Sequence, residues 1–273
     1  MKKISFLLSV LIAHGASFAQ ISLPAVFSDH MVLQRNKEIP VWGFAGPGEK
    51  ISIRFHQQTE QTTANAAGEW MIRLKPETAG GPYSLIVEGK NNLTFPDVLV
   101  GDVWFCSGQS NMEWDMSRTD GYEQEIQQNS FPPIRQIKIQ KAVSSMPLKN
   151  LVPTQWKVTD TNTLREFSGV AYFFAKKMQL AHNVPIGIIN DSWGGTNIET
   201  WIPRESFEGS AYFRDRIGKL PVMAGDSFRN FIFERQKLAI EARQKNRLAD
   251  FNEANFLSDA YDESRAADIV CPT

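Results

Sequence analysis

The sequence predicts an α/β protein in which a small β-sandwich is followed by a domain built on parallel strands. Before residue 100, short apolar runs alternate with turn residues, whereas two later runs are almost continuously apolar. Continuous apolar runs are typical of parallel strands that are covered on both faces. Between the later runs lies a segment whose apolar residues fall on one face of a helix. With 273 residues, the chain is long enough for about two domains.

The first domain is predicted from six short apolar runs separated by glycine, proline and asparagine. In the third run, Ile51, Ile53 and Phe55 alternate with polar residues, as in a strand with one solvated face. The runs cover residues 31–34, 39–44, 51–55, 70–74, 83–87 and 93–95. Strands at this spacing favour a β-sandwich over residues 20–98, without a helix of any length.

The second domain is predicted over residues 99–273. Its near-continuous apolar runs are Val103–Cys106 and Ile186–Ile189, and Ile134–Ile139 is a third, more exposed strand candidate. The helical stripe consists of Val170, Phe173, Phe174, Met178 and Ala181. A strand, a helix and a strand in this order imply a parallel sheet. The charged segment from about 226 to 257 is typical of a long, mostly solvated helix.

The composition and the missing motifs argue against several classes of function. A formal net charge of -1, without a basic cluster beyond the N-terminus, gives no electrostatic footprint for nucleic acid. Phosphate-loop and dinucleotide glycine motifs are absent, as are the His-Glu-x-x-His and Cys-x-x-Cys metal spacings. We therefore expect no cofactor, no metal and no nucleic-acid partner. A buried, unpaired Cys106 is favoured over a disulfide with Cys271.

Residues 1–19 have the pattern of a signal peptide. Lys2 and Lys3 are followed by an apolar segment over 4–13 and by small residues at the two positions that a signal peptidase inspects. The apolar segment is too short to span a bilayer as a stable helix. We therefore expect an exported protein, periplasmic or secreted, that begins at Gln20 and has no membrane anchor.

Two polar stretches, 107–112 and 190–197, follow the first and third predicted parallel strands. In one common doubly wound sheet the strand order is 2-1-3, and ligands bind at the carboxyl ends of strands one and three. A serine at such a strand-to-helix turn is exposed in the crevice, which suits acyl transfer. The N–H groups of Ser110 and of Gly194 or Gly195 would then stabilise the oxyanion of ester cleavage.

Structural explanations for the same residues stay open. Ser107 or Ser110 could cap a helix, and residues 193–196 could form a tight turn with an aromatic plug. Asp191 lies close enough to the crevice to take part, but it could equally hold the turn. Asp102 is at the wrong end of its strand, and His182 reads as a cation at a helix end.

The motifs also carry a family resemblance. The segment VWFCSGQSNMEW at 103–114 closely resembles the first motif block of the sialate O-acetylesterase family, a carbohydrate-esterase branch of the SGNH hydrolases. The segment PIGIINDSWGGTNIETW at 185–201 looks like the second block. FSDHMVLQR at 27–35 and PVWG at 40–43 resemble the start of the β-rich domain that precedes the catalytic domain in this family.

The resemblance implies a three-layer α/β/α SGNH-type domain that removes acetyl groups from sialic acids or related carbohydrates without a metal. Ser110 is then the nucleophile, and a glycine of the Gly194–Gly195 pair belongs to the oxyanion hole. The same family pattern implies oxyanion or substrate-binding roles for the neighbours Gln109, Asn111, Trp193 and Thr196. By analogy with serine hydrolases, a histidine takes the serine proton and an aspartate orients that histidine.

The chain departs from the family pattern beyond the second block. The Trp-Tyr-Gln-Gly-Glu-Ser-Asn-like block and the Asp-x-x-His block are missing, and no histidine follows His182. We therefore expect a C-terminally truncated esterase domain, in preference to the recruitment of His182, His30 or His56 as the base. Two alternatives to a sialate esterase stay open: an acetylxylan-type polysaccharide esterase, and a non-catalytic carbohydrate-binding remnant.

Overall fold

The computed structural model describes residues 20–128, 131, 133–218, 221–223 and 225–244. The strands are β1 (Val32–Gln34), β2 (Ile39–Phe44), β3 (Lys50–Phe55), β4 (Gln58–Thr63), β5 (Glu69–Leu74), β6 (Gly80–Glu88), β7 (Asn92–Gly108), β8 (Ile134–Lys138), β9 (Trp156–Val158) and β10 (Ile186–Ser192). The helices are α1 (Ser110–Glu113), α2 (Tyr122–Gln128), α3 (Gly169–His182), α4 (Arg204–Glu208), α5 (Ala211–Gly218) and α6 (Gly225–Gln244), with short 3-10 turns at Met116–Arg118, Leu164–Glu166 and Ile198–Trp201.

The N-terminal part is β-rich, as predicted. The two-stranded sheet β2–β5 packs on the sheet of β3, β4, β6, β1 and the first half of β7, and their inner faces form one apolar core. Along β2, buried residues alternate strictly with half-buried ones, which is the pattern expected of a sandwich strand. Strand β4 is additional to the predicted set, because its sequence QTEQTT has no apolar residue to reveal it.

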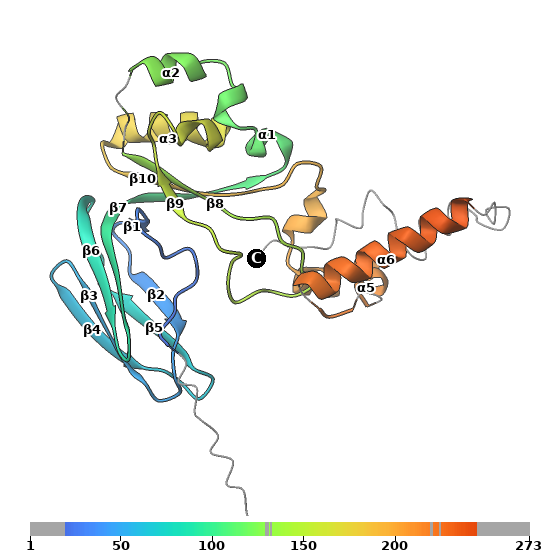
Figure 1. Cartoon of the computed structure of the whole chain (residues 1–273), viewed down its shortest axis with the longest axis horizontal. Helices are drawn as coiled ribbons and strands as arrows, with labels where there is room; N and C mark the ends of the chain where they lie inside the picture. Colours follow the sequence, from blue (N-terminus) through green and yellow to red (C-terminus); the bar gives the residue numbers. More distant parts are fainter. Residues whose placement is uncertain (1–19, 129–130, 132, 219–220, 224, 245–273) are drawn as a thin grey trace, which may run out of the picture.

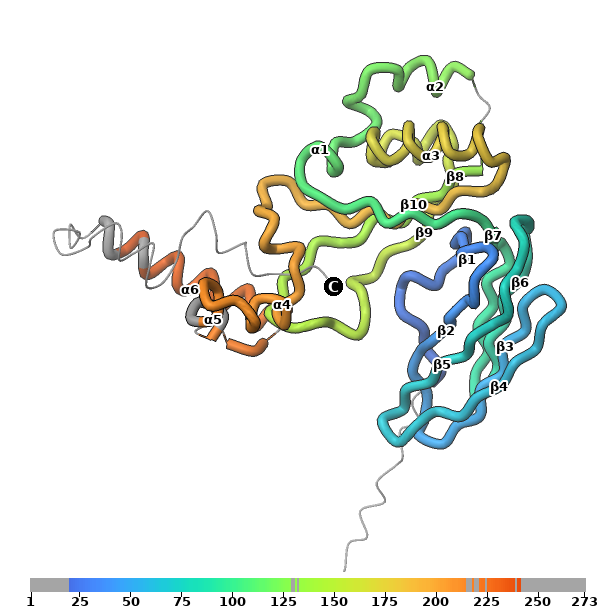
Figure 2. The backbone as a smooth tube through the Cα atoms, turned by 180° about the vertical axis from the view of Figure 1, so that it is seen from behind, coloured from blue at the N-terminus to red at the C-terminus, as the bar shows by residue number. Residues whose placement is uncertain are grey.

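Strand β7 joins the two parts of the protein. It is 17 residues long, pairs with β6 and β1 over its first part, and pairs with β10 from Asp102 to Gly108. Figure 2 shows it running from the β-rich strands to α1. The predicted domain boundary between residues 98 and 99 lies inside this strand. The serine that follows β7 is therefore positioned by a strand that belongs to both cores.

The predicted strand order is wrong, although the mixed α/β class is confirmed. The three parallel strands follow the order β7-β10-β8, so the third predicted strand is central instead of the first. Six of the seven residues of β10 are buried, and Gly187 lets Val32 and Trp156 pack against its face. The first strand instead has an open side, where Phe105 is 64% exposed. A central position thus goes to the strand that is covered on both faces.

Strand β8 is also less exposed than predicted. Ile134, Arg135, Gln136 and Ile137 are all buried. The Arg135 guanidinium donates to Asp97 Oδ1 at 2.7 Å, which satisfies its charge below the surface. The buried Arg135 is thus paired with the partly exposed Asp97, and Gln136 Oε1 accepts a hydrogen bond from Ser168 N–H at 3.1 Å.

Helices α1, α2 and α3 cover one face of the parallel strands, and the β-rich part packs against the other (Figure 1). Helix α3 forms over the predicted segment, but the predicted stripe is not its buried face. Val170, Phe173 and Phe174 are exposed, and the buried residues are Gly169, Ala171, Tyr172 and Ala175. Ser168 Oγ accepts a hydrogen bond from Ala171 N at its start, and Asn183 ends it in the left-handed conformation with φ 51°. Helix α6 matches the first part of the predicted charged helix, whose remainder lies outside the described residues.

The remaining sequence predictions have mixed outcomes. Cys106 is buried and unpaired in the described part of the chain, as expected, whereas Cys271 and the predicted signal peptide lie outside it. Burial raises the pKa of the Cys106 thiol. Across the described ranges, no helix combines the length and apolarity needed to cross a membrane.

Candidate functional site

The two polar stretches predicted to form the site meet at the carboxyl ends of β7 and β10. In the parallel register Ser107 lies beside Asp191 and Gly108 beside Ser192. The pairing continues one step further, where Trp193 N–H donates to Gly108 O at 2.9 Å. Gly108 then turns the chain into α1 with φ 146°, a conformation that residues with a Cβ rarely adopt.

Ser110 is exposed at the start of α1 and lies against the Gly194 turn. A Cβ built on Gly194 would sit 3.5 Å from both Cα and Cβ of Ser110, so the absence of a side chain there leaves room beside the serine. Ser110 Oγ donates to Gln109 Oε1 at 3.1 Å. Gln109 occupies the N-cap position without a side-chain cap bond, so neither Ser107 nor Ser110 is the cap residue. The helix that follows the strand is one turn long.

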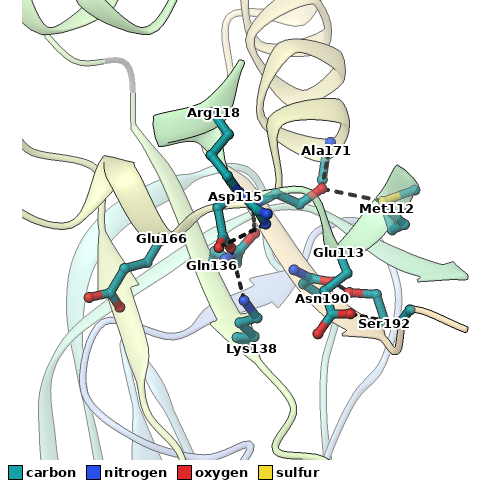
Figure 3. A network of polar contacts seen from close by, with 12 residues as sticks. Met112, Glu113, Asp115, Arg118, Gln136, Lys138, Glu166, Ala171, Asn190 and Ser192 are labelled. Atoms are coloured by element: carbon teal, nitrogen blue, oxygen red, sulfur yellow. Dashed lines mark hydrogen bonds and ion pairs between the residues drawn. The ribbon is translucent and has the colours of Figure 1, made fainter. Parts of the chain in front are cut away.

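Glu113 is a site residue that the sequence analysis did not identify. Its Oε2 accepts a hydrogen bond from Gly194 N–H at 2.6 Å, and its Oε1 lies 2.5 Å from Lys141 Nζ. Burial raises the pKa of Glu113, but the bonds from Lys141 and Gly194 together hold this pKa below its usual range. Lys141 Nζ also lies 5.4 Å from the centre of the Trp193 ring. Figure 3 shows Glu113 beside Asn190 and Ser192 at the end of β10.

These contacts restrict which backbone N–H groups can donate a hydrogen bond to an oxyanion. The Gly194 N–H is already donated to Glu113. Among the described residues, the N–H groups of Ser110 and Gly195 have no acceptor. Gly195 is exposed, has φ 83°, and would have open space around an added Cβ. The geometry therefore favours Ser110 and Gly195 as donors, with Gly194 fixed by the carboxylate of Glu113.

The other predicted site residues surround this pair. Asn111 is exposed on α1, one residue after the serine. Thr196 Oγ1 donates to Trp193 O at 2.7 Å and accepts from Trp201 Nε1 at 3.1 Å. Thr196 thus closes the turn that carries the glycines, which agrees with the tight-turn interpretation of residues 193–196. The roles of Gln109, Asn111, Trp193 and Thr196 toward a substrate stay predictions.

A buried polar cluster lies at the end of β10. Ser192 Oγ donates to Asn190 Oδ1 at 2.7 Å, while Asn190 Nδ2 is buried without a partner in the described part of the chain. Asp191 is 7% exposed, and no hydrogen bond of its carboxylate is found among the described residues. Burial raises the pKa of Asp191 to about 6. Asp191 therefore does not hold the turn through its side chain.

The described histidines lie away from Ser110. His30 is paired with Asp97 at 2.6 Å, and His56 with Glu77 at 3.3 Å, both in the β-rich part. His182 ends α3, as predicted, and interacts with Asp102, where the part of β7 that pairs with β10 begins. From there to Ser110 the strand spans about 25 Å. The described ranges also contain no cluster of three or more His, Cys, Asp or Glu side chains suited to a metal ion.

Comparisons with known proteins point to carbohydrate esterases. Residues 100–231 match the family described as "Carbohydrate esterase, sialic acid-specific acetylesterase". Sialate O-acetylesterase of Mus musculus is 30% identical over 214 residues, which are 70% of this chain and 40% of that protein. The enzyme of Homo sapiens is 31% identical over 194 residues, 64% of this chain and 37% of that protein.

A solved structure also resembles this chain. A carbohydrate acetylesterase from Xanthomonas citri has 38% sequence identity and a TM-score of 0.67, and the match covers 70% of this chain and 44% of that protein. This likeness supports the mixed α/β fold. The chain spans less than half of the length of each of these three proteins.

Proposed function

The chain belongs to the carbohydrate esterase family of sialic acid-specific acetylesterases, and we propose that it hydrolyses acetyl esters of carbohydrates through Ser110. The observation that carries this proposal is the position of Ser110. An exposed hydroxyl follows a long, doubly anchored strand and lies beside a glycine turn in which Gly195 has open space around it. Sialic acid is the sugar that the family description favours.

The proposed reaction has two steps. Ser110 Oγ attacks the acetyl carbonyl carbon and loses its proton to a base, and the resulting oxyanion accepts hydrogen bonds from the N–H groups of Ser110 and Gly195. The C–O bond to the sugar then breaks, the sugar oxygen takes a proton, and an acetyl-serine remains. Water hydrolyses this ester and releases acetate. Glu113 acts as a positioning residue because it fixes the turn that contains both glycines.

The base is not among the described histidines, since His30, His56 and His182 all lie elsewhere. A histidine oriented by an acidic residue is the usual solution in serine hydrolases. The family resemblance implies such a pair in the Asp-x-x-His block, which this sequence lacks. The one histidine outside the described residues is His14, in the predicted signal peptide.

Turnover by the whole 273-residue chain tests the proposal. Hydrolysis of 4-nitrophenyl acetate and of O-acetylated sialic acid should fall at least about a thousandfold in Ser110→Ala. The matched control is Ser117→Ala, because Ser117 is an exposed serine on the next short helix. A Ser110→Ala protein with wild-type rates would show that this hydroxyl is not the nucleophile.

A second candidate, carbohydrate binding without hydrolysis, is favoured by the lack of a histidine beside Ser110 in the described ranges. It predicts that the wild-type chain binds acetylated sugars and releases no acetate. Measurable turnover that depends on Ser110 eliminates this candidate. Comparing acetate release from acetylxylan with release from O-acetylated sialic acid separates a polysaccharide esterase from a sialate esterase.

A further inference from the structure

A cavity of about 660 Å³ lies on the β-rich part, between β2, β5 and the connection from β8 to β9. This volume is within the range of small-molecule sites. Cross-strand partners Trp42 and Met71 lie on the outer face of the β2–β5 sheet, since their neighbours Val41 and Ile72 point into the core. The cavity is lined chiefly by Val26, Trp42, Glu69, Met71, Lys149 and Asn150.

The apolar side of the cavity is a fixed aromatic platform. Trp42 is half-buried, and an edge-to-face contact with Phe27, with ring centres 4.7 Å apart, holds its ring in place. Met71 lies directly opposite and is 48% exposed. A rigid indole beside a thioether offers a surface that suits the C–H face of a sugar ring.

The polar side of the cavity is formed by side chains that hydrogen bonds or an ion pair hold in place. Asn150 Oδ1 accepts hydrogen bonds from Ala25 N at 3.2 Å and from Leu151 N at 2.8 Å. These bonds orient the amide so that its two N–H groups stay available, because no acceptor for them is found among the described residues. The Glu69 carboxylate is paired with Lys149. Fixed donors and acceptors beside an apolar platform match the hydroxyl groups of a sugar.

The cavity and the candidate esterase site are connected by one segment, residues 139–155. Lys141 in this segment is bound to Glu113 beside the nucleophile, and Ser145 Oγ donates to Pro221 O at 2.6 Å. Lys149 and Asn150 then reach the cavity. Asn150 follows Lys141 by nine positions, so at full extension these two residues lie no more than about 30 Å apart.

We propose that this cavity is a second carbohydrate-binding site, which holds a pyranose ring of the glycan whose acetyl group reaches Ser110. The assignment of a sugar rests on the proposed esterase function. The platform of Trp42 and Met71, and the oriented amide of Asn150, are independent of that function. The second site favours extended glycans over free monosaccharides, because one extended glycan can occupy this cavity and the candidate esterase site at the same time.

Binding of unacetylated glycans to the whole chain tests the proposal without hydrolysis. Calorimetric titration with sialyllactose and, separately, with xylotetraose should show binding of at least one, and the better probe identifies the glycan class. Trp42→Ala should weaken binding about tenfold or more, and Asn150→Asp about fivefold, because the aspartate keeps the acceptor oxygen but removes the donor. The matched control is Arg73→Ala, which changes an exposed β5 residue outside the cavity and should bind like wild type.

The outcomes separate this site from the esterase proposal. Failure of both glycans to bind the wild-type chain, or unchanged affinity in folded Trp42→Ala and Asn150→Asp proteins, overturns the second site. If circular dichroism shows that Trp42→Ala does not fold, the glycan affinity of Asn150→Asp alone tests the second site. Hydrolysis of 4-nitrophenyl acetate should be unchanged in the control Arg73→Ala, and its absence in a wild-type chain that binds glycans contradicts the esterase proposal alone.

Discussion

Replacing Asp191 by asparagine should make the protein more stable at neutral pH. The carboxyl is 7% exposed at the end of β10, and burial raises its pKa from 3.8 to about 6. One pKa unit corresponds to about 1.4 kcal/mol, so holding the ionised form in this position costs about 3 kcal/mol at pH 7. Asparagine has nearly the same shape and no charge, and the variant should recover most of that free energy.

The stability gained by Asp191→Asn must shrink as the pH falls. Because the pKa of Asp191 is higher in the folded protein, the folded state binds more protons between pH 3.8 and about 6. The penalty is therefore absent below the unfolded pKa and complete above about pH 6. At pH 4 the advantage of Asp191→Asn should shrink to less than about 1 kcal/mol.

Urea denaturation at pH 7 and at pH 4 measures this difference, provided that the m-value is unchanged. The control is Asp102→Asn at the other end of the same pair of strands. Arg35 binds Asp102 at 2.8 and 3.0 Å and holds its pKa below the usual range, so this carboxylate contributes stability at neutral pH that is lost as the pH falls. A destabilised Asp191→Asn at pH 7, or a gain that is equal at both pH values, would show that the buried carboxylate of Asp191 carries no such penalty.

Two further substitutions test local contacts. Glu113→Gln should lower kcat/KM for ester hydrolysis about tenfold, because the charge that holds Lys141 and orders the Gly194 N–H is lost; an unchanged rate in steady-state kinetics would exclude a positioning role. Ser168→Ala should cost about 1 kcal/mol in urea denaturation, because the α3 cap bond to Ala171 N is lost. An unchanged midpoint would mean that this cap contributes nothing.

The parts of the fold that follow local patterns were predictable from the sequence. Helix α3 and its stop at Asn183 are set by residues close together along the chain, and both are confirmed, whereas the buried face is Ala171, Tyr172 and Ala175 instead of the predicted stripe. The meeting of the Ser110 and Gly194 stretches was also predictable, because parallel strands present their carboxyl ends at one edge. The predicted strand order 2-1-3 is wrong, but the observed order β7-β10-β8 also places the first and third predicted strands side by side, so the placement holds.

The parts that depend on distant partners were not predictable. Glu113 looks like an ordinary helix residue until Lys141 and the Gly194 N–H, far along the chain, are placed next to it. Arg135 suggests an exposed strand, but its guanidinium is buried and forms an ion pair with the partly exposed Asp97. Periodicity describes one segment at a time, and it cannot report a charge that a remote residue satisfies.

Covalent labelling tests most directly whether the Ser110 hydroxyl is an activated nucleophile beside the Gly194–Gly195 turn. The whole chain is treated with a fluorophosphonate, which reacts with activated serines, and the modified peptide is mapped by mass spectrometry. We expect a single adduct on Ser110, lost in Ser110→Ala and prevented by a competing acetylated glycan. A chain that hydrolyses acetyl esters while its adduct maps to another serine would show that Ser110 is not the nucleophile.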